Sequence, residues 1–272
     1  MYLDIENALF TCAMGLYLVS TVLYFVFFAL KKEKPATVAG WTMTAGFLFH
    51  TAALAVRSIG AGRLPLTNQY EFATGFAWGI CLCFLVFLYK YKFKGLGVFA
   101  APIVFLVIGY AAMQSREVRA LMPALRSNWL SIHVSAAILS YGAFGVACAI
   151  SLMYLVRGRM AEGSFFAGHV PQRDRLDLLS YRAISFGFLF LTFVIVSGAI
   201  WAERAWGSYW SWDPKETWSL ITWIIYAIYL HLRLSRGMRG RSAALFAVIG
   251  FVCVLFTYAG VNTFIPGIHS YA

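Results

Sequence analysis

The chain has 272 residues, of which 61% are hydrophobic and only 12% are charged, and its mean hydropathy is strongly positive. That composition excludes an ordinary soluble globular domain and predicts an all-α integral membrane protein. A net charge of +11 could indicate a nucleic-acid binder, but the basic residues form short clusters between long apolar segments, a pattern that orients a membrane protein. The five cysteines lie in apolar segments without CxxC spacing, so neither a disulfide framework nor a zinc site is predicted.

A bundle of about eight transmembrane helices is predicted, because eight segments approach the roughly 20 apolar residues needed to cross a bilayer. They are residues 7–30, 38–60, 72–90, 96–113, 129–156, 182–203, 216–234 and 243–261. Asp4 and Glu6 precede the first segment, where a cleavable signal peptide would carry basic residues, so we expect a retained span. We interpret residues 1–272 as a single transmembrane domain.

The basic residues predict the orientation of the bundle. Fifteen of the 22 lie in the links after the first, third, fifth and seventh segments, and seven lie on the other side. The positive-inside rule therefore places both termini outside the cytoplasm. We expect a multi-pass protein of a bacterial inner membrane, or of the thylakoid membrane if the gene is plastid-encoded.

Two histidines lie inside predicted spans, His50 near the middle of the second segment and His231 toward the inner end of the seventh. An ionisable side chain within a span indicates function, because its burial there is costly; a neutral imidazole bonded to a hydroxyl is the alternative. At 1.5 Å per residue, His50 lies about 15 Å and His231 about 22 Å from the outer ends of their helices. A shared haem iron is one hypothesis for this pair, and a proton relay or an unliganded core pair is the other.

The outer link GRLPLTNQYEF, residues 62–72, is predicted to be an ordered turn. Pro65 and Asn68 favour a turn, and Glu71 at the head of the third helix suits the helix dipole. We interpret this link as structural packing beneath a tryptophan-rich outer loop at residues 201–218.

That loop follows the sixth segment and contains WGSYWSWDPKETW. Six of the nine tryptophans lie within 23 residues: Trp201, Trp206, Trp210, Trp212, Trp218 and Trp223. An aromatic belt at the membrane interface explains any one of them, but not so many indoles in one loop with Asp213 and Pro214. Pro214 can open the next helix with Asp213 as its N-cap, so we expect an ordered loop.

Clustered indoles form a rigid apolar platform with N–H donors at its rim, which matches a large flat ligand with polar edges, such as haem. Arg204 and Lys215, and also Arg57 or Arg63, could bond haem propionates; contact with lipid headgroups is the alternative. The candidate haem-binding residues are Trp206, Trp210, Trp212, Asp213, Trp218, Arg204 and Lys215.

Two further histidines are expected on the side of the tryptophan loop. His133 lies one turn into the fifth segment, in NWLSIHV, and His269 lies in the tail FIPGIHSY. Two imidazoles approaching a haem from opposite faces would make the iron six-coordinate; a solvated tail histidine is the alternative for His269. His169, in the cytoplasmic link, receives no role.

Taken together, WGSYWSWDPKETW resembles the WWD signature of the cytochrome c assembly proteins, the haem-handling family that includes CcsA (ResC), CcmC and CcmF. The span plan, LPLTNQYE, His133, His231 and His269 look most like CcsA. The resemblance implies that haem b enters from the cytoplasm and meets His50 and His231. It also implies that the haem reaches the outer loop with His133 and His269 as axial ligands, where it is joined to the CxxCH segment of a c-type apocytochrome.

The resemblance further implies a CcsB (ResB)-type membrane partner. No catalytic constellation of Ser, Cys or carboxylate residues is evident, so the chain would be the haem-presenting subunit of a cytochrome c synthase complex. Two alternatives remain: a HemX-like membrane haem-binding regulator or chaperone of tetrapyrrole synthesis, and a secondary transporter of another solute.

Overall fold

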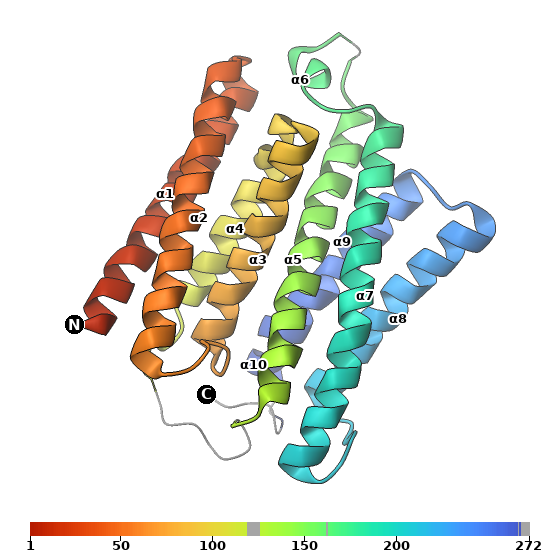
Figure 1. The fold of residues 1–272 in the computed structure, drawn as a ribbon. Coiled ribbons are helices and arrows are strands. Elements are labelled where there is room, and N and C mark those ends of the chain that lie inside the picture. Colours follow the sequence, from red (N-terminus) through yellow and green to blue (C-terminus); the bar gives the residue numbers. More distant parts are fainter. Residues whose placement is uncertain (119–125, 162, 266, 268–272) are drawn as a thin grey trace.

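The computed structural model describes residues 1–118, 126–161, 163–265 and Gly267, and over these residues the protein is an all-helical bundle without strands (Figure 1). This confirms the predicted fold class. The helices are α1 (Tyr2–Leu30), α2 (Glu33–Ala61), α3 (Gln69–Tyr91), α4 (Gly97–Ala112, after the 3₁₀ turn Lys94–Leu96), α5 (Asn128–Arg157), α6 (Phe165–Gly168), α7 (Arg173–Trp206), α8 (Pro214–Arg236) and α9 (Arg241–Leu255). The last long helix continues from α9 through the π-helical turn η3 (Phe256–Gly260) into α10 (Val261–Phe264).

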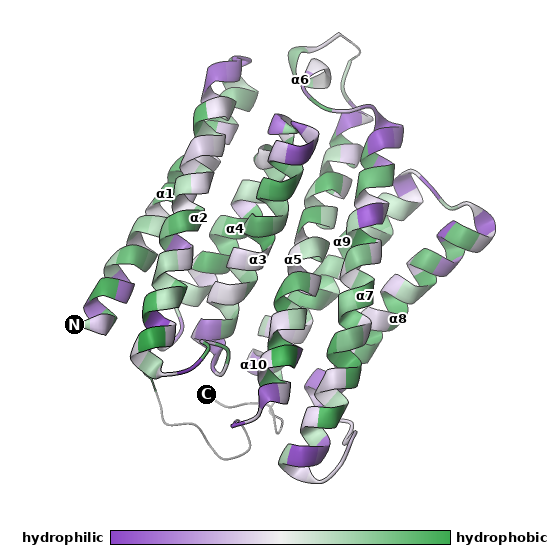
Figure 2. Cartoon of the chain, in the orientation of Figure 1, coloured by the Kyte–Doolittle hydropathy of each residue, from purple (hydrophilic) through white to green (hydrophobic). Residues whose placement is uncertain are grey.

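A helix covers most of each of the eight predicted segments. Within the described part of the chain, six helical stretches are long and apolar enough to cross a membrane: α1, α3, α4 with its 3₁₀ turn, α5, α7 and the α9–α10 helix. Helices α2 and α8 are not among them. In Figure 2 both helices carry weakly hydrophobic or hydrophilic residues, in white and purple, between their hydrophobic ones. The count of eight spans therefore stays a prediction.

The start of α1 and the short helix α10 lie toward one end of the bundle in Figure 1, and α6 lies at the other. The tryptophan-rich loop, between α7 and α8, is at the same end as α10. An even number of passes explains this arrangement. Which side of the membrane each end faces stays a prediction.

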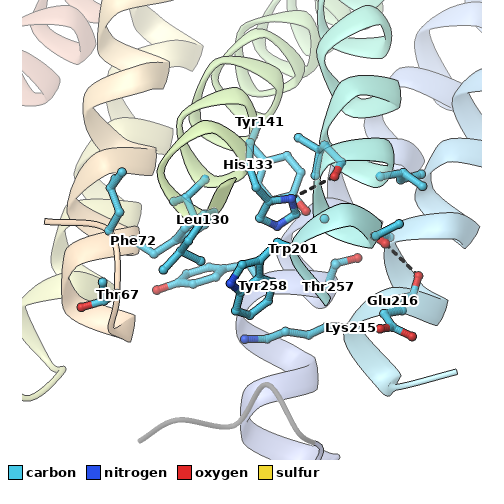
Figure 3. A pocket seen from close by; sticks show the side chains of 18 of the residues that line it. Thr67, Phe72, Leu130, His133, Tyr141, Trp201, Lys215, Glu216, Thr257 and Tyr258 are labelled. Atoms are coloured by element: carbon cyan, nitrogen blue, oxygen red, sulfur yellow. Dashed lines mark hydrogen bonds between the residues drawn. The ribbon is translucent and has the colours of Figure 1, made fainter. Parts of the chain in front are cut away.

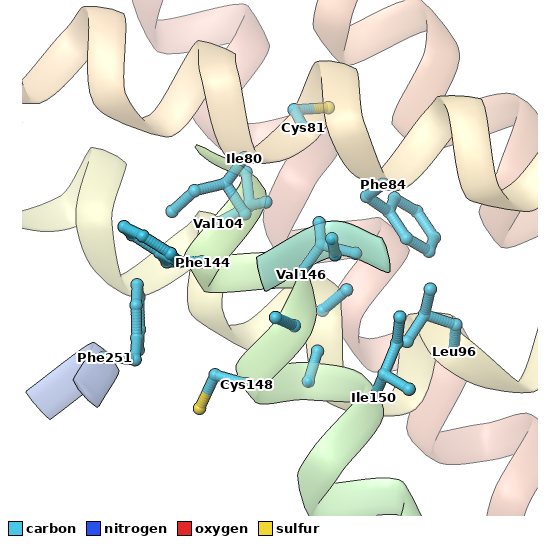
Figure 4. Close-up of a cluster of buried hydrophobic side chains, with 14 of the residues drawn as sticks. Ile80, Cys81, Phe84, Leu96, Val104, Phe144, Val146, Cys148, Ile150 and Phe251 are labelled. Atoms are coloured by element: carbon cyan, nitrogen blue, oxygen red, sulfur yellow. The ribbon is translucent and has the colours of Figure 1, made fainter. Parts of the chain in front are cut away.

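Helix α5 is the centre of the bundle, with α3, α7 and α9 packed around it. Its buried face contributes Phe144, Val146, Cys148 and Ile150 to the apolar core (Figure 4). The ring of Phe144 stacks on Tyr226 of α8, with centroids 3.7 Å apart. This packing fixes α5, which carries His133 near its N-terminal end, against the helices around it.

Glycines allow α3 and α5 to approach closely. A Cβ at Gly142 would lie 2.6 Å from the carbonyl carbon and oxygen of Gly79 on α3. Backbone atoms cannot rotate away as a side chain can, so the crossing tolerates only hydrogen at this position. Small residues commonly permit such contacts between membrane helices.

We predict that Gly142→Ala lowers the free energy of unfolding by about 1–3 kcal/mol, because the added methyl overpacks the α3–α5 crossing. Gly109→Ala in α4 is the control, since a Cβ there meets nothing within 4 Å and alanine favours a helix. Unfolding of the purified variants by denaturing detergent measures the difference. Equal stabilities of the two variants would contradict this account of the crossing.

Candidate functional site

A pocket opens near α10, between α3, α5, α7, the start of α8 and η3 (Figure 3). Its empty volume, including the open mouth, is about 1150 Å³. The walls are mainly apolar and aromatic, with Phe72, Leu130, Tyr141, Trp201 and Tyr258 among them. A concave lining of mainly apolar and aromatic residues with a few polar groups is typical of ligand sites.

His133 of α5 is the imidazole that lines this pocket. Its Nδ1 lies 2.9 Å from the carbonyl oxygen of Val194. A carbonyl only accepts, so Nδ1 carries the proton and donates, and the lone pair of the ring is on Nε2. In this tautomer Nε2 is the nitrogen that can bind a metal, and donation from the other nitrogen to a carbonyl is common among metal-ligating histidines.

Two residues of α7 fix the position of the His133 ring. A Cβ at Gly198 would lie 2.8 Å from His133 Cε1, so glycine leaves room for the ring. The indole of Trp201 lies nearly parallel to the imidazole, at 21° and a centroid distance of 6.4 Å. The ring is therefore oriented by its neighbours before any ligand binds.

The loop between α7 and α8 is ordered by a capping box, which confirms the predicted N-cap at Asp213 with Pro214 in the first turn. Asp213 accepts a hydrogen bond from the Lys215 amide at 3.0 Å. The Glu216 carboxylate accepts from the amides of Ser211 at 2.8 Å and Asp213 at 3.2 Å. Between them, Trp212 has a φ of +59°, which is rare for a bulky residue and marks a conformation imposed by its surroundings.

The indoles of the loop do not form one flat platform. Trp201 and Trp210 line the pocket. Trp206 meets the edge of Trp201 at a centroid distance of 6.3 Å, and Trp212, which is 69% exposed, meets Trp210 at 5.8 Å. Trp218 packs on Phe256 of η3 at a centroid distance of 4.3 Å, and it does not line the pocket.

Of the basic residues proposed for propionates, Lys215 lines the pocket. The guanidinium of Arg204 lies over the ring of Trp129, 5.6 Å from its centroid. Arg57 and Arg63 are bonded to Glu71. The structure therefore brings Lys215, but not these arginines, to the pocket.

The link before α3 is a wall of the pocket, a role beyond the packing expected from the sequence. Leu66, Thr67, Asn68 and Gln69 all line it. Asn68 caps α3 by accepting from the Glu71 amide at 2.8 Å, and Tyr258 of η3 donates to the Gln69 carbonyl at 2.7 Å. Proline, asparagine and glutamate in LPLTNQYE signalled an ordered turn, but no pattern indicated which cavity it faces.

A buried charge network holds this wall. The carboxylate of Glu71 accepts from Thr67, through the amide at 2.8 Å and the hydroxyl at 3.0 Å, and from Arg63 at 2.9 Å. Its other oxygen accepts from Arg57 Nε at 2.9 Å, and Arg57 Nη1 reaches both oxygens of Glu6 in α1 at 3.1 Å. The network thus ties α1, α2, α3 and the pocket wall together.

The two histidines predicted within spans are not brought together. His50 is fully buried and its Nδ1 lies 3.2 Å from the hydroxyl of Tyr17, as in the neutral-imidazole alternative. His231 is exposed on α8. Helices α2 and α8 lie on opposite sides of the bundle in Figure 1, with α5 and α7 between them.

The remaining histidines are separated by position. His269 lies outside the described residues; Gly267, two residues before it, packs against the side chains of Asp213 and Pro214. His169 lies near the opposite end of the bundle, where Nδ1 is 2.7 Å from the Phe165 carbonyl and Nε2 is 2.9 Å from Glu33. The carbonyl, and then the carboxylate, raise the pKa of His169 by accepting from the protonated ring.

Comparison with known proteins identifies the family. The profile of the family described as "Cytochrome C assembly protein" matches residues 66–269. The chain belongs to this cytochrome c assembly family. The match covers the pocket wall, His133, the capped tryptophan loop and the tail, so family membership and the pocket rest on the same residues.

The relatives are proteins named cytochrome c biogenesis protein CcsA. The protein of Synechococcus sp. strain CC9605 is 38% identical, with 94% of each chain covered, and that of Guillardia theta is 36% identical, with 93% of this chain and 92% of the other covered. The Chlamydomonas reinhardtii protein is 43% identical over 80% of this chain, but the match spans only 64% of that protein. Membership places the chain among the proteins of cytochrome c maturation.

A solved structure has the same fold. The cytochrome c heme lyase CcmF superposes with a TM-score of 0.76 and 16% identity, covering 95% of this chain and 46% of that one. The helical arrangement is therefore shared with a membrane protein about twice as long.

We predict that Glu71→Ala lowers the free energy of unfolding by about 3–5 kcal/mol, because it leaves the buried Arg57 without one of its two carboxylates. Unfolding by denaturing detergent measures the loss. Hydrogen exchange at the Thr67 amide is expected to accelerate, because that amide loses its acceptor. Asp4→Ala is the control, since its ion pair with the N-terminus is exposed and surface pairs contribute little. Slow exchange at Thr67 in Glu71→Ala would show that the network does not hold the wall.

Proposed function

We propose that the chain binds haem in the outer pocket and presents it for covalent attachment to a c-type apocytochrome. The observation that carries the proposal is His133, held in an aromatic pocket as the tautomer with its lone pair on Nε2. Family membership supports the choice of ligand. In this proposal His133 supplies one axial ligand of the iron and His269 supplies the other.

The pocket suits a haem in its other properties as well. Aromatic rings offer flat apolar contacts to a macrocycle, and the ammonium of Lys215 can pair with a propionate. Glycine at position 198 lets the imidazole lie close against α7, and both residues line the pocket. The structure does not bring His50 and His231 together, so we propose the outer pocket as the haem site formed by this chain alone.

The attachment joins two cysteine thiols of a CxxCH segment to the two vinyl groups of haem. In each addition a sulfur–carbon bond forms, the vinyl double bond is lost, and the thiol proton ends on the neighbouring carbon. The chain contributes position, not a nucleophile. It would hold the iron between two imidazoles and keep the rest of the macrocycle within reach of the apocytochrome.

The proposed assembly follows from the same residues. The pocket opens at the end predicted to face away from the cytoplasm, where the apocytochrome would meet it. A CcsB-type membrane partner would complete the synthase in the bacterial inner membrane or the thylakoid membrane.

We predict that the purified wild type shows the absorption spectrum of bis-histidine haem, and that His133→Gly and His269→Gly each lose it. Added imidazole is expected to restore the spectrum, because it fills the space of the missing side chain and supplies the same nitrogen ligand. His169→Gly, near the other end of the bundle, is the matched control and is expected to keep the wild-type spectrum. A colourless wild type that still supports cytochrome c maturation would refute the assignment.

A further inference from the structure

Asn262 is a pocket residue whose side-chain amide makes no hydrogen bond in the structure. It lies in α10, directly after the π-helical turn, and it lines the pocket. Its Nδ2 and Oδ1 are both shielded from solvent, and neither has a hydrogen-bond partner in the structure. Among the described residues that line the pocket, Asn262 is alone in this respect.

Buried polar groups in folded proteins nearly always have partners, because losing hydrogen bonds to water costs free energy that only a new bond recovers. A carboxamide with both ends unsatisfied therefore needs an explanation. Its place on the wall of a ligand-sized pocket supplies one, since a bound ligand would bring the missing partner.

The π turn explains how this amide reaches the pocket. In a regular α-helix, residues five apart point about 140° away from one another. In η3 the amide of Val261 bonds to the carbonyl of Phe256, five residues earlier, so residues five apart lie one turn apart. Thr257 and Asn262 consequently both line the pocket. Such π turns occur frequently at functional sites.

The neighbours of Asn262 are already bonded. The hydroxyl of Thr257 donates to the Cys253 carbonyl at 2.8 Å, and that of Tyr258 donates to Gln69. These two residues build the wall. The side-chain amide of Asn262 can therefore bond to a ligand in the pocket.

We infer that Asn262 donates a hydrogen bond from Nδ2 to a carboxylate of the ligand in this pocket, which is a propionate if the ligand is haem. The choice of a carboxylate rests on Lys215, whose ammonium group lines the same pocket. A water that hydrates the carboxylate would donate to Oδ1. This inference rests on the proposed function and adds to it the residue that recognises the polar edge of haem.

The test compares Asn262→Leu and Asn262→Asp with the wild type as full-length protein in detergent, titrated with haem and with haem dimethyl ester. Leucine removes the amide at similar volume, so without haem it is expected to unfold at the same temperature as the wild type or higher. Its affinity for haem is expected to fall about tenfold, the effect of losing one hydrogen bond to a charged group.

Asn262→Asp is expected to lose more affinity for haem than Asn262→Leu, because it places a carboxylate against a propionate. With the dimethyl ester, which has no propionate charge, the wild type and the two variants are expected to differ by less. Thr263→Val is the matched control, since Thr263 is exposed, lies next to Asn262 and does not line the pocket.

Two results would overturn the inference alone: equal haem affinities of wild type and both variants, or a lower unfolding temperature of haem-free Asn262→Leu, which would show a structural partner for the amide. A wild type that binds no haem would reject the proposed function, and this inference with it.

Discussion

The packing around the pocket depends on the guanidinium of Arg57. It lies between the carboxylates of Glu6 and Glu71, shielded from solvent, and it thereby joins three helices. Charges in such surroundings interact strongly, and each is costly if its partner is removed. The same Glu71 carboxylate holds Thr67, so the geometry of the pocket wall is set by an ion pair outside the pocket. The pocket thus depends on α1 and α2, although neither helix contributes a residue to its lining.

The pocket is assembled from segments far apart in the sequence, which is why a bundle of long helices suits it. Helix α5 supplies the imidazole, α7 supplies the glycine and the indole beside it, the π turn supplies Tyr258, and α10 supplies Asn262. Close crossing of α3 and α5 at Gly79 and Gly142 keeps the pocket wall and the imidazole in register. The site is therefore a product of helix packing more than of any single loop.

Much of the fold could be read from the sequence, because apolar length and the spacing of basic clusters report where helices begin and end. His133 could be singled out, because the topology predicted from the basic clusters places it on the same side as the tryptophan loop. Which helices pack side by side could not be predicted in the same way, because nothing in the residues around His50 and His231 indicates which helices are neighbours. Asn262 was missed for a related reason, because one asparagine in an apolar helix has no periodic signal, and only the π turn aims it inward.

The capping box of α8 has a consequence for affinity. Glu216 fixes the backbone of Ser211 and Asp213 in the protein alone, and Trp212 is held at a φ that it would rarely adopt by itself. A loop that becomes ordered only on association loses about 0.5–1.5 kcal/mol for each side chain immobilised. Here that entropy is lost during folding, so a ligand meets a surface already in its final shape, and more of the contact energy is retained as affinity.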